Sequence, residues 1–589
     1  MAKLPGVSRT ILAGFFTLMF VLLWISNLMF EMRYPVDSMY SNAFIEAHLK
    51  TNPIDEDFQK QSNLPRLESL SCSKYGGPDD SLVQELIYWE DIPSDAEFKS
   101  PFYDTNKYLT FEPDHGGWNN IRMAFETIVV MAHAFGRTLV LPPKKKMYLL
   151  GRENISFETF FHLDSIKHHL KGLNVISMEE FLRREGLTRN LGRPPPDGKV
   201  SWDGVDQRPL LLYLRDVALM RAEWDPMKCL AGIPARKGKE SIRNLEEIDK
   251  RIRSMTKDEL DHNKFVGKPV GSDASAFDRL RENMGGREGL CIYDQEMQDA
   301  KVIHFKVDHG DHTRMLTHFY EFVFFEDWKQ DLWAKRFVRD HMRYRNEVYC
   351  AAAKIVNAVR TKAKEYNPKN KAGIYDSFHV RRGKSMHFKS IHPLLRTLLP
   401  FVIIKATSST KEHGKYTLHV IFIFMINMFH SLYYSFVWHR LEASKILSIS
   451  EPHLEKGSTL YIATDEKGKE FFNEFRNTYD IHFLSNFTHL VPDIPPYYYG
   501  MLDQIVASRG NTFFGTWFSS FSGYINRMRG YYSVKNKLDG YEDGVLRSWY
   551  FTEDRHEEMR EYRSSRLPLY MREFPTSWRD IDKGIEELL

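Results

Sequence analysis

Apolar positions recur at helical and strand spacing through most of the chain, beginning at about residue 108. After "GGWNN", the apolar side chains Ile121, Phe125 and Ile128 recur at intervals of four and three residues, which predicts a helix. Gly136 ends this helix, and "TLVLPP" after it is typical of a short buried strand. With the strand predicted at "YLTFE", these elements form a strand, helix, strand unit.

The same alternation predicts the rest of the fold. Residues 151–300 indicate a mostly helical and charged region, and "AKVIHF" near Ile303 predicts another strand. The runs "RMLTHFYEFVFFEDWKQDLWAKRFVRDHMRY" and "NEVYCAAAKIVNAVRTKAKEY" predict helices. Strands follow at "AGIYDSFHV", "STLYIATD" and "IHFLS", and "YYGMLDQIVASRGNTFFGTWFSSFSGYINRMRG" predicts helix, strand, turn and helix. We therefore predict an α/β protein with parallel sheets, in two domains that flank a cleft: 101–365, and 366–383 with 440–589.

The N-terminal residues predict a membrane anchor. Residues 11–30 carry no charge, and an apolar run of about 20 residues spans the hydrocarbon core of a bilayer. The run is longer than the apolar part of a cleaved signal peptide and no cleavage site follows it, so an uncleaved signal anchor fits better. Lys3 and Arg9 precede it, which favours a cytosolic tail at 1–10 and a lumenal body. We expect a single-pass type II protein of the Golgi or endoplasmic reticulum membrane, with residues 31–100 as a stem.

Sequons and cysteines agree with a lumenal body. Asn154 in "NIS" and Asn486 in "NFT" are acceptor sites for N-glycosylation. Four cysteines are able to form two disulfides in an oxidising compartment, and three pairings are open. The cysteines are Cys72, Cys229, Cys291 and Cys350. Their spacings match no zinc-binding pattern, so we expect no metal site.

The overall charge argues against one class of partner. The 589 residues carry a formal net charge of only +3, in an ordinary globular mixture of 42% hydrophobic and 27% charged residues. A dedicated nucleic-acid binder needs a concentrated basic face, and the main dense basic run is the short "PPKKKM". We therefore expect no nucleic-acid partner.

Two of the segments at the carboxyl ends of predicted strands, where parallel sheets bind ligands, suit a phosphate. "DHGGWNN" offers a glycine turn and a helix N-terminus that favours an anion, although such turns also have purely structural roles. In "HVRRG", Arg381 and Arg382 alternate across the strand, so only one faces the cleft, and His379 shares the face of Arg381. A guanidinium at this place is able to bind a diphosphate bidentately, and the alternative is a solvent-exposed pair.

Two further segments supply carboxyl and hydroxyl groups at strand ends. "ATD" ends at Asp465, which either contacts a ligand or caps the next helix. "TWFSSFSGY" places Ser519, Ser520 and Ser522 around a helix start, where hydroxyls and amides suit a phosphate. Helix capping explains one of these serines, but not all of them.

Together, "GGWNNIR", "HVRRG", "YIATD" and "ASRGNTFFGTWFSSFSGYINRMRGYY" resemble the motifs of the GDP-fucose protein O-fucosyltransferases and related plant and fungal proteins. The resemblance runs from about Tyr108 to Trp578, apart from one apolar block. It implies a GT-B architecture, in which two Rossmann-like domains hold the donor between them. It also implies no metal and no cofactor, with GDP-fucose as the donor substrate.

The resemblance further implies roles for single residues. His379 and Arg381 hold the donor diphosphate, and Arg381 is catalytic, because a fixed guanidinium stabilises the charge that develops on the departing GDP. Gly117 and Asn119 line the cleft near the phosphate and sugar, and Asp465 contacts the nucleoside. Three residues at a helix start also contact the donor: Ser519, Ser520 and Phe521.

The chain departs from the family pattern at two positions. Some members have a glutamate just before the glycine of the first motif as candidate general base, whereas this chain has Gly116, preceded by Asp114 and His115. In many relatives an acidic residue continues the arginine motif, and here the motif continues with Lys384. The general base is therefore not assigned.

Residues 384–439 form an apolar insertion in the second domain. A single membrane span by "YTLHVIFIFMINMFHSLYYSFVW" would place "HVRRG" and "YIATD" on opposite sides of the bilayer. Our hypothesis is translated non-coding sequence, such as a retained intron, because "GKS" can be encoded with a splice-donor-like sequence and "SLYYSF" by a pyrimidine-rich tract. Sequencing the mRNA tests this hypothesis, which a block present in every transcript of a fully active protein would contradict.

Three functions are weighed. The leading prediction is a lumenal glycosyltransferase that moves fucose from GDP-fucose to a hydroxyl of a protein or glycan and inverts the anomeric centre. A second interpretation keeps the fold and changes the nucleotide sugar, since strand-end arginines bind any diphosphate. A third is a catalytically silent relative that binds a nucleotide sugar or a glycan, because the insertion and the missing acidic residue would disable the site.

Overall fold

The computed structural model describes residues 69–382 and 441–582, apart from short gaps. The gaps are 79–80, 149, 152, 164–165, 167–168, 221–223, 257–270, 272, 308–313, 517–518, 539–546, 552–555, 559–572 and 574. The predicted cytosolic tail, signal anchor and apolar insertion lie outside the described residues, as does the stem up to residue 68. Across the described ranges, no helix is both long and apolar enough to cross a membrane.

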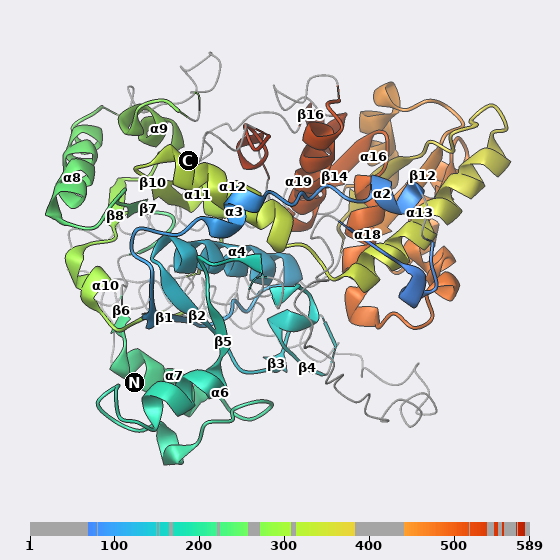
Figure 1. Ribbon diagram of the computed structural model, residues 1–589. Coiled ribbons are helices and arrows are strands. Elements are labelled where there is room, and N and C mark those ends of the chain that lie inside the picture. Colours follow the sequence, from blue (N-terminus) through green and yellow to red (C-terminus); the bar gives the residue numbers. More distant parts are fainter. Residues whose placement is uncertain are drawn as a thin grey trace, which may run out of the picture. The chain divides into compact units, whose positions relative to one another are not determined.

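Five parallel strands form the first sheet. They are β1 (Asp104–Phe111), β2 (Arg137–Leu141), β5 (Val175–Ser177), β6 (Leu219–Met220) and β9 (Val302–Phe305). Their order is β5-β2-β1-β9-β6. β2 is buried along its whole length, as expected for a parallel strand covered on both faces, and α4 (Trp118–Ala134) packs against it (Figure 1). Gly136 follows α4 with a φ of 63°, which confirms the predicted helix end.

The prediction for residues 151–344 missed a second sheet. Its strands are β7 (Cys229–Ile233), β8 (Gly289–Ile292) and β10 (Val323–Phe325), which are parallel in the order β10-β7-β8. The interpretation of the run from Arg314 as helix throughout is wrong, since β10 separates α11 (Phe319–Phe322) from α12 (Trp328–His341). All residues of β10 are buried, and the periodicity of such a short apolar run does not distinguish it from a buried helix. A short antiparallel pair, β3 (Lys145–Lys146) and β4 (Asn154–Ile155), lies outside these sheets.

The third sheet has six strands and contains the predicted strands of the second domain. They are β11 (Asp376–Val380), β12 (Thr459–Thr464), β13 (Asp480–His482), β14 (Phe513–Thr516), β15 (Ser548–Phe551) and β16 (His556–Glu558). The order is β13-β12-β11-β14-β15-β16, and every pair is parallel except β15 with β16. The predicted class, an α/β protein with parallel sheets, is confirmed.

Helices cover these sheets and supply most of the remaining core. They include α2 (Ser81–Glu85), α3 (Pro93–Glu97), α6 (Met178–Phe181), α7 (Arg208–Val217), α8 (Lys239–Arg253), α9 (Ala276–Asn283), α10 (Gln295–Asp299), α13 (Asn346–Tyr366), α16 (Ala443–Ser450), α17 (Asn473–Arg476), α18 (Tyr499–Ser508) and α19 (Ser520–Lys535). The helix predicted at "NEVYCAAAKIVNAVRTKAKEY" is confirmed as α13. α19 is buried on almost all sides, so its polar side chains need partners inside the protein.

Residues 69–100 pack into the folded body, although residues 31–100 were predicted to form a stem. Tyr88 is buried, and its hydroxyl lies 2.9 Å from that of Tyr349 on α13. The hydroxyl of Tyr532 on α19 donates a hydrogen bond of 2.9 Å to a main-chain carbonyl of this segment. Apolar side chains of this kind gain free energy by leaving water, so the segment completes the core instead of standing apart from it.

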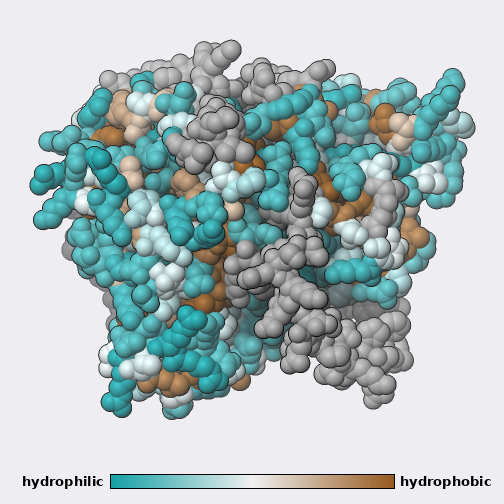
Figure 2. Space-filling model, in the orientation of Figure 1, coloured by the Kyte–Doolittle hydropathy of each residue, from teal (hydrophilic) through white to brown (hydrophobic). Residues whose placement is uncertain are grey.

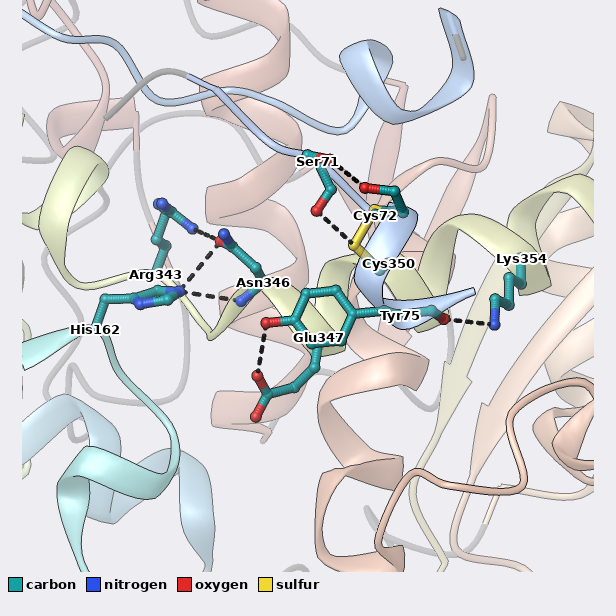
Figure 3. The surroundings of a disulfide bond; sticks show 10 residues. Ser71, Cys72, Tyr75, His162, Arg343, Asn346, Glu347, Cys350 and Lys354 are labelled. Atoms are coloured by element: carbon teal, nitrogen blue, oxygen red, sulfur yellow. Dashed lines mark hydrogen bonds between the residues drawn. A yellow bond between two sulfur atoms is a disulfide. The ribbon is translucent and has the colours of Figure 1, made fainter. Parts of the chain in front are cut away.

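The four cysteines form two disulfides, Cys72–Cys350 and Cys229–Cys291. This selects one of the three pairings that the sequence leaves open. Figure 3 shows the first disulfide, which joins the N-terminal described segment to α13. Next to it, Nζ of Lys354 donates a hydrogen bond of 2.9 Å to the carbonyl oxygen of Tyr75 (Figure 3). The segment is therefore held covalently as well as by packing.

The described residues on either side of the apolar insertion meet in the structure. Nη1 of Arg382, which precedes the insertion, donates a hydrogen bond of 2.8 Å to the carbonyl oxygen of Leu441, which follows it. The chain therefore leaves and rejoins the second domain at one place.

The face shown in Figure 2 is mostly hydrophilic. Large apolar side chains that are exposed come from different elements and loops, and they include Leu187, Leu212, Met227, Tyr366 and Ile374. Apolar residues exposed singly are normal on a protein surface and mark no particular site.

Candidate active site

The six-stranded sheet has one place where the chain order reverses. β11 continues to β12 and β13 on one side, and β14 continues to β15 and β16 on the other. In a parallel sheet, the crevice beyond the carboxyl ends of the strands at such a reversal is the usual place for a ligand. His379 and Arg381 lie at the end of β11, and α19 begins shortly after β14. The topology thus brings predicted donor-binding residues to one edge of the sheet.

Two residues of α19 hold His379 in this crevice. Nδ1 of His379 lies 2.7 Å from the hydroxyl oxygen of Ser522, and the His379 ring stacks on Phe521 at a centroid distance of 4.4 Å. Burial lowers the pKa of His379 to about 3, and the positive charge of Arg381 acts in the same direction. The imidazole is therefore neutral near pH 7, and it serves as a hydrogen-bonding group rather than as a cation.

The two arginines after β11 are held differently. The backbone N–H of Arg381 donates to Oγ1 of Thr516 (3.1 Å), which itself donates to the carbonyl oxygen of His379 (2.9 Å). Nε of Arg382 donates to Oε2 of Glu466 (3.0 Å), so this guanidinium takes part in the packing of its own domain. The Arg382 guanidinium is thus engaged within its own domain, and the contact of Arg381 with a diphosphate stays a prediction.

Asp465 joins the ends of two neighbouring strands. Its Oδ1 accepts a hydrogen bond of 2.7 Å from the backbone N–H of Arg382. The next helical turn begins at Lys469 and has Gly468 as its N-cap, so Asp465 is not a helix cap. Its contact with a nucleoside stays a prediction.

The N-termini of α4 and α19 meet at the crevice. Gly117 is the N-cap of α4, Asn119 lies in its first turn, and Oδ1 of the next residue, Asn120, accepts a hydrogen bond of 2.8 Å from the Ser520 hydroxyl of α19. Ser519 is the N-cap of α19, and its buried hydroxyl has no hydrogen-bond partner among the described residues. Two adjoining helix N-termini favour an anion, because their first N–H groups lack partners within the helix.

A buried charge network joins α4 and α19 further along both helices. Arg527 of α19 forms ion pairs of 2.7 Å with Glu126 of α4 and with Glu573, and Arg122 of α4 also pairs with Glu126. Each of these four side chains is at most 1% exposed. Burial lowers the pKa of Arg527, but the two carboxylates raise it well above its usual range. The network therefore holds together the two helices that begin at the crevice.

Asp114, in the loop before α4, is fully engaged. It accepts hydrogen bonds from Nε (2.6 Å) and Nη2 (2.9 Å) of Arg314 and one of 2.6 Å from the backbone N–H of Gly116. A Cβ at position 116 would lie 2.7 Å from Oδ1 of Asp114. A glutamate at position 116 would therefore force the side chains of Asp114 and Asn120 to move.

Glu112, the other carboxylate of this loop, is also paired. Burial acts to raise its pKa, but hydrogen bonds from His304 and Arg215 lower the pKa of Glu112 to about 2. A general base works best with a pKa near the working pH, so Glu112 is poorly suited to that role. A pocket adjoins the loop at the ends of β1 and β9, and its lining includes Phe111, Phe125, Phe157, Phe305 and Met315.

The sequence also predicted two glycosylation sites and no metal site. In the part of the chain that the structure covers, no three His, Cys, Asp or Glu side chains are grouped to hold a metal ion. Asn154 and Asn486 are both exposed. Metal independence and glycosylation stay predictions.

The sheet topology, the strand-end residues and the paired helix N-termini define an α/β protein whose strand ends suit a phosphorylated ligand. The sequence pattern of the GDP-fucose protein O-fucosyltransferase family matches residues 108–391 and 441–532, which is more than half of the chain. The chain therefore belongs to the GDP-fucose protein O-fucosyltransferase family. This confirms the predicted family and the predicted enzyme class, a glycosyltransferase that uses GDP-fucose. The match is interrupted where the apolar insertion lies.

The solved structures that match the chain include two fucosyltransferases. POFUT1 in complex with GDP-fucose is 15% identical, with coverage of 76% of this chain and 98% of that chain and a TM-score of 0.31. The fucosyltransferase NodZ from Bradyrhizobium is 11% identical, with coverage of 72% and 93% and a TM-score of 0.28. No curated protein sequence matches the chain. The assignment to the family rests on the match of the family pattern.

Proposed function

We propose that the protein transfers fucose from GDP-fucose to a hydroxyl group of a protein or glycan, with inversion of the anomeric centre and without a metal ion. The observation that carries this proposal is the sheet edge beyond β11 and β14, where His379, Arg381 and the N-terminus of α19 lie together in a chain of this family. The N-termini of α4 and α19 supply partial positive charge at the same place.

In this proposal, Arg381 stabilises the departing GDP. Negative charge grows on the diphosphate as the bond to fucose breaks, so a fixed guanidinium binds the transition state more tightly than the substrate. Neutral His379 and the Ser519 hydroxyl supply hydrogen bonds, and the guanidinium with the helix N-termini replaces the charge that a metal would supply. Inversion follows from a single displacement, in which the acceptor oxygen attacks the face opposite to GDP.

The donor preference tests this proposal. We expect the purified protein to release GDP from GDP-fucose with a kcat/KM at least about tenfold above that for GDP-mannose or UDP-glucose, because the crevice then recognises both the nucleotide and the sugar. The rate is expected to be unchanged by EDTA. Preference for another nucleotide sugar would support the second interpretation, and binding without turnover would support a silent relative.

We also propose that the body of the protein lies in the lumen of the Golgi or endoplasmic reticulum, anchored by residues 11–30. The positive residues before the apolar run, the exposure of both sequons and the two disulfides support this topology. In sealed microsomes, the body is expected to resist added protease. Glycosidase treatment is expected to reduce the mass of the protein. The variants Asn154→Gln and Asn486→Gln are expected to lose this reduction in mass. Complete digestion in sealed vesicles would contradict the topology.

A further inference from the structure

A buried chain of hydrogen bonds ends at the side chain of Asn119. Nε1 of Trp118 donates to the hydroxyl oxygen of Tyr344 (3.2 Å), and that hydroxyl donates to Oε1 of Gln504 (2.7 Å). Nε2 of Gln504 then donates to Oδ1 of Asn119 (2.8 Å). Tyr344 and Gln504 are 0% exposed, so water does not replace these bonds. The chain links α4 with α18 and with the loop before α13.

The indole of Trp118 sets the direction of the whole chain. An indole N–H only donates, so the Tyr344 oxygen accepts from it and turns its own hydrogen towards Gln504. With Oε1 of Gln504 accepting, only its NH₂ group faces Asn119. If both amides were reversed, the Tyr344 hydroxyl would receive two donors and its hydrogen would have no acceptor in a buried place, which is unfavourable.

This order leaves one group of Asn119 available. Its carbonyl oxygen is used by Gln504, and its NH₂ group has no partner among the described residues. Asn119 keeps 8% of its surface exposed. It lies in the first turn of α4, next to Asn120, which bonds to Ser520 at the start of α19. Asn119 therefore belongs to the first turn of α4, whose N-terminus meets that of α19.

We propose that Trp118, Tyr344 and Gln504 are positioning residues, which orient the Asn119 amide so that its NH₂ group donates to an oxygen of the bound nucleotide sugar. This inference rests on the proposed function, since it names how one donor of that site is oriented. An asparagine amide that is free to rotate would present its carbonyl oxygen to an anionic ligand part of the time, and that contact is repulsive. The hydrogen-bond chain removes this second orientation before the ligand binds.

A double-mutant cycle tests the proposal. Tyr344→Phe removes the hydroxyl and keeps the ring, so that Gln504 loses the bond that sets its orientation. We expect this variant to lower kcat/KM for GDP-fucose about tenfold in the wild-type background, and to change it little in an Asn119→Ala background. Tyr375→Phe is the matched control, because it removes a buried hydroxyl that donates to α18 at Val506 (2.8 Å) outside the chain. We expect the control to retain the wild-type value.

The possible results distinguish a positioning role from a loss of stability, and they test this role separately from the proposed function. An equal loss from Tyr344→Phe in both backgrounds, or no loss in the wild-type background, would overturn the positioning role. Melting temperatures of all variants show whether a loss comes from unfolding. The same cycle is measured on the affinity for GDP by calorimetry, where the coupling between Tyr344 and Asn119 is also expected. If the wild-type protein transfers no fucose but the coupling in GDP affinity persists, the proposed function is wrong and the positioning role stands.

Discussion

The variant Arg381→Ala is expected to lower kcat for fucosyl transfer by about 10² or more. In the proposed mechanism, the guanidinium at the end of β11 supplies positive charge where negative charge develops on GDP, and removal of one such fixed contact typically costs this much in rate. Steady-state kinetics with GDP-fucose give the measurement. Arg381→Lys is expected to recover little, because an ammonium group does not reproduce the two parallel hydrogen bonds of a guanidinium.

Arg382→Ala is the matched control for this variant. It removes the neighbouring guanidinium, which binds Glu466 and the carbonyl oxygen of Leu441 instead of facing the crevice. We expect it to lower stability and to lose far less turnover per folded molecule than Arg381→Ala. Equal turnover losses in the two alanine variants, or near-normal turnover in Arg381→Ala, would refute the catalytic assignment of Arg381.

The variant Glu573→Ala is expected to lower the free energy of unfolding by about 3–5 kcal/mol. The carboxylate pairs with Arg527 at 2.7 Å and accepts a hydrogen bond from Tyr320, and it is 1% exposed. Without Glu573, Arg527 and Arg122 would share Glu126, so one buried positive charge would lack compensation, which costs this much in typical cases. Urea unfolding curves of the wild type and the variant give the measurement.

Two further variants define the cause of that loss. Glu573→Gln keeps the shape and one acceptor but removes the charge, so it is expected to lie between the wild type and the alanine variant. Glu97→Ala removes an ion pair with Lys171 in which both side chains are more than half exposed, and we expect little change because water screens such pairs. A Glu573→Ala protein as stable as Glu97→Ala would show that the buried network adds nothing to stability.

The residues of the candidate site were predicted unevenly. His379 and Arg381 follow from a strand that ends in "HVRRG", because side chains two positions apart share a face. Ser522 was noted only as part of a helix start, whereas the structure shows that it contacts His379. Gln504 and Tyr344 were not predicted at all. Their only signal is a polar group on a buried face, which indicates that a partner exists without identifying it.

Some features of the fold also depended on distant parts of the chain. β10 lies in a run with the composition of a buried helix, and it became a strand because β7 pairs with it. Residues 69–100 contain no long periodic pattern, yet they are buried against α13 and α19. Local sequence does not reveal such pairing, since each partner lies far away along the chain.

Sequence reasoning alone predicted strands β11 to β14 and helices α18 and α19, the strand-end positions of His379 and Arg381, and the family, but it did not predict β15 and β16. These properties depend on residues close together in the chain, where periodicity and motif order are visible. The folded structure was needed to establish the disulfide pairing, the contact of Arg527 with Glu126 and the bond from Gln504 to Asn119. The last two contacts join residues 401 and 385 positions apart. A buried polar group binds whichever partner the completed fold brings within hydrogen-bond distance, and no local pattern specifies that partner.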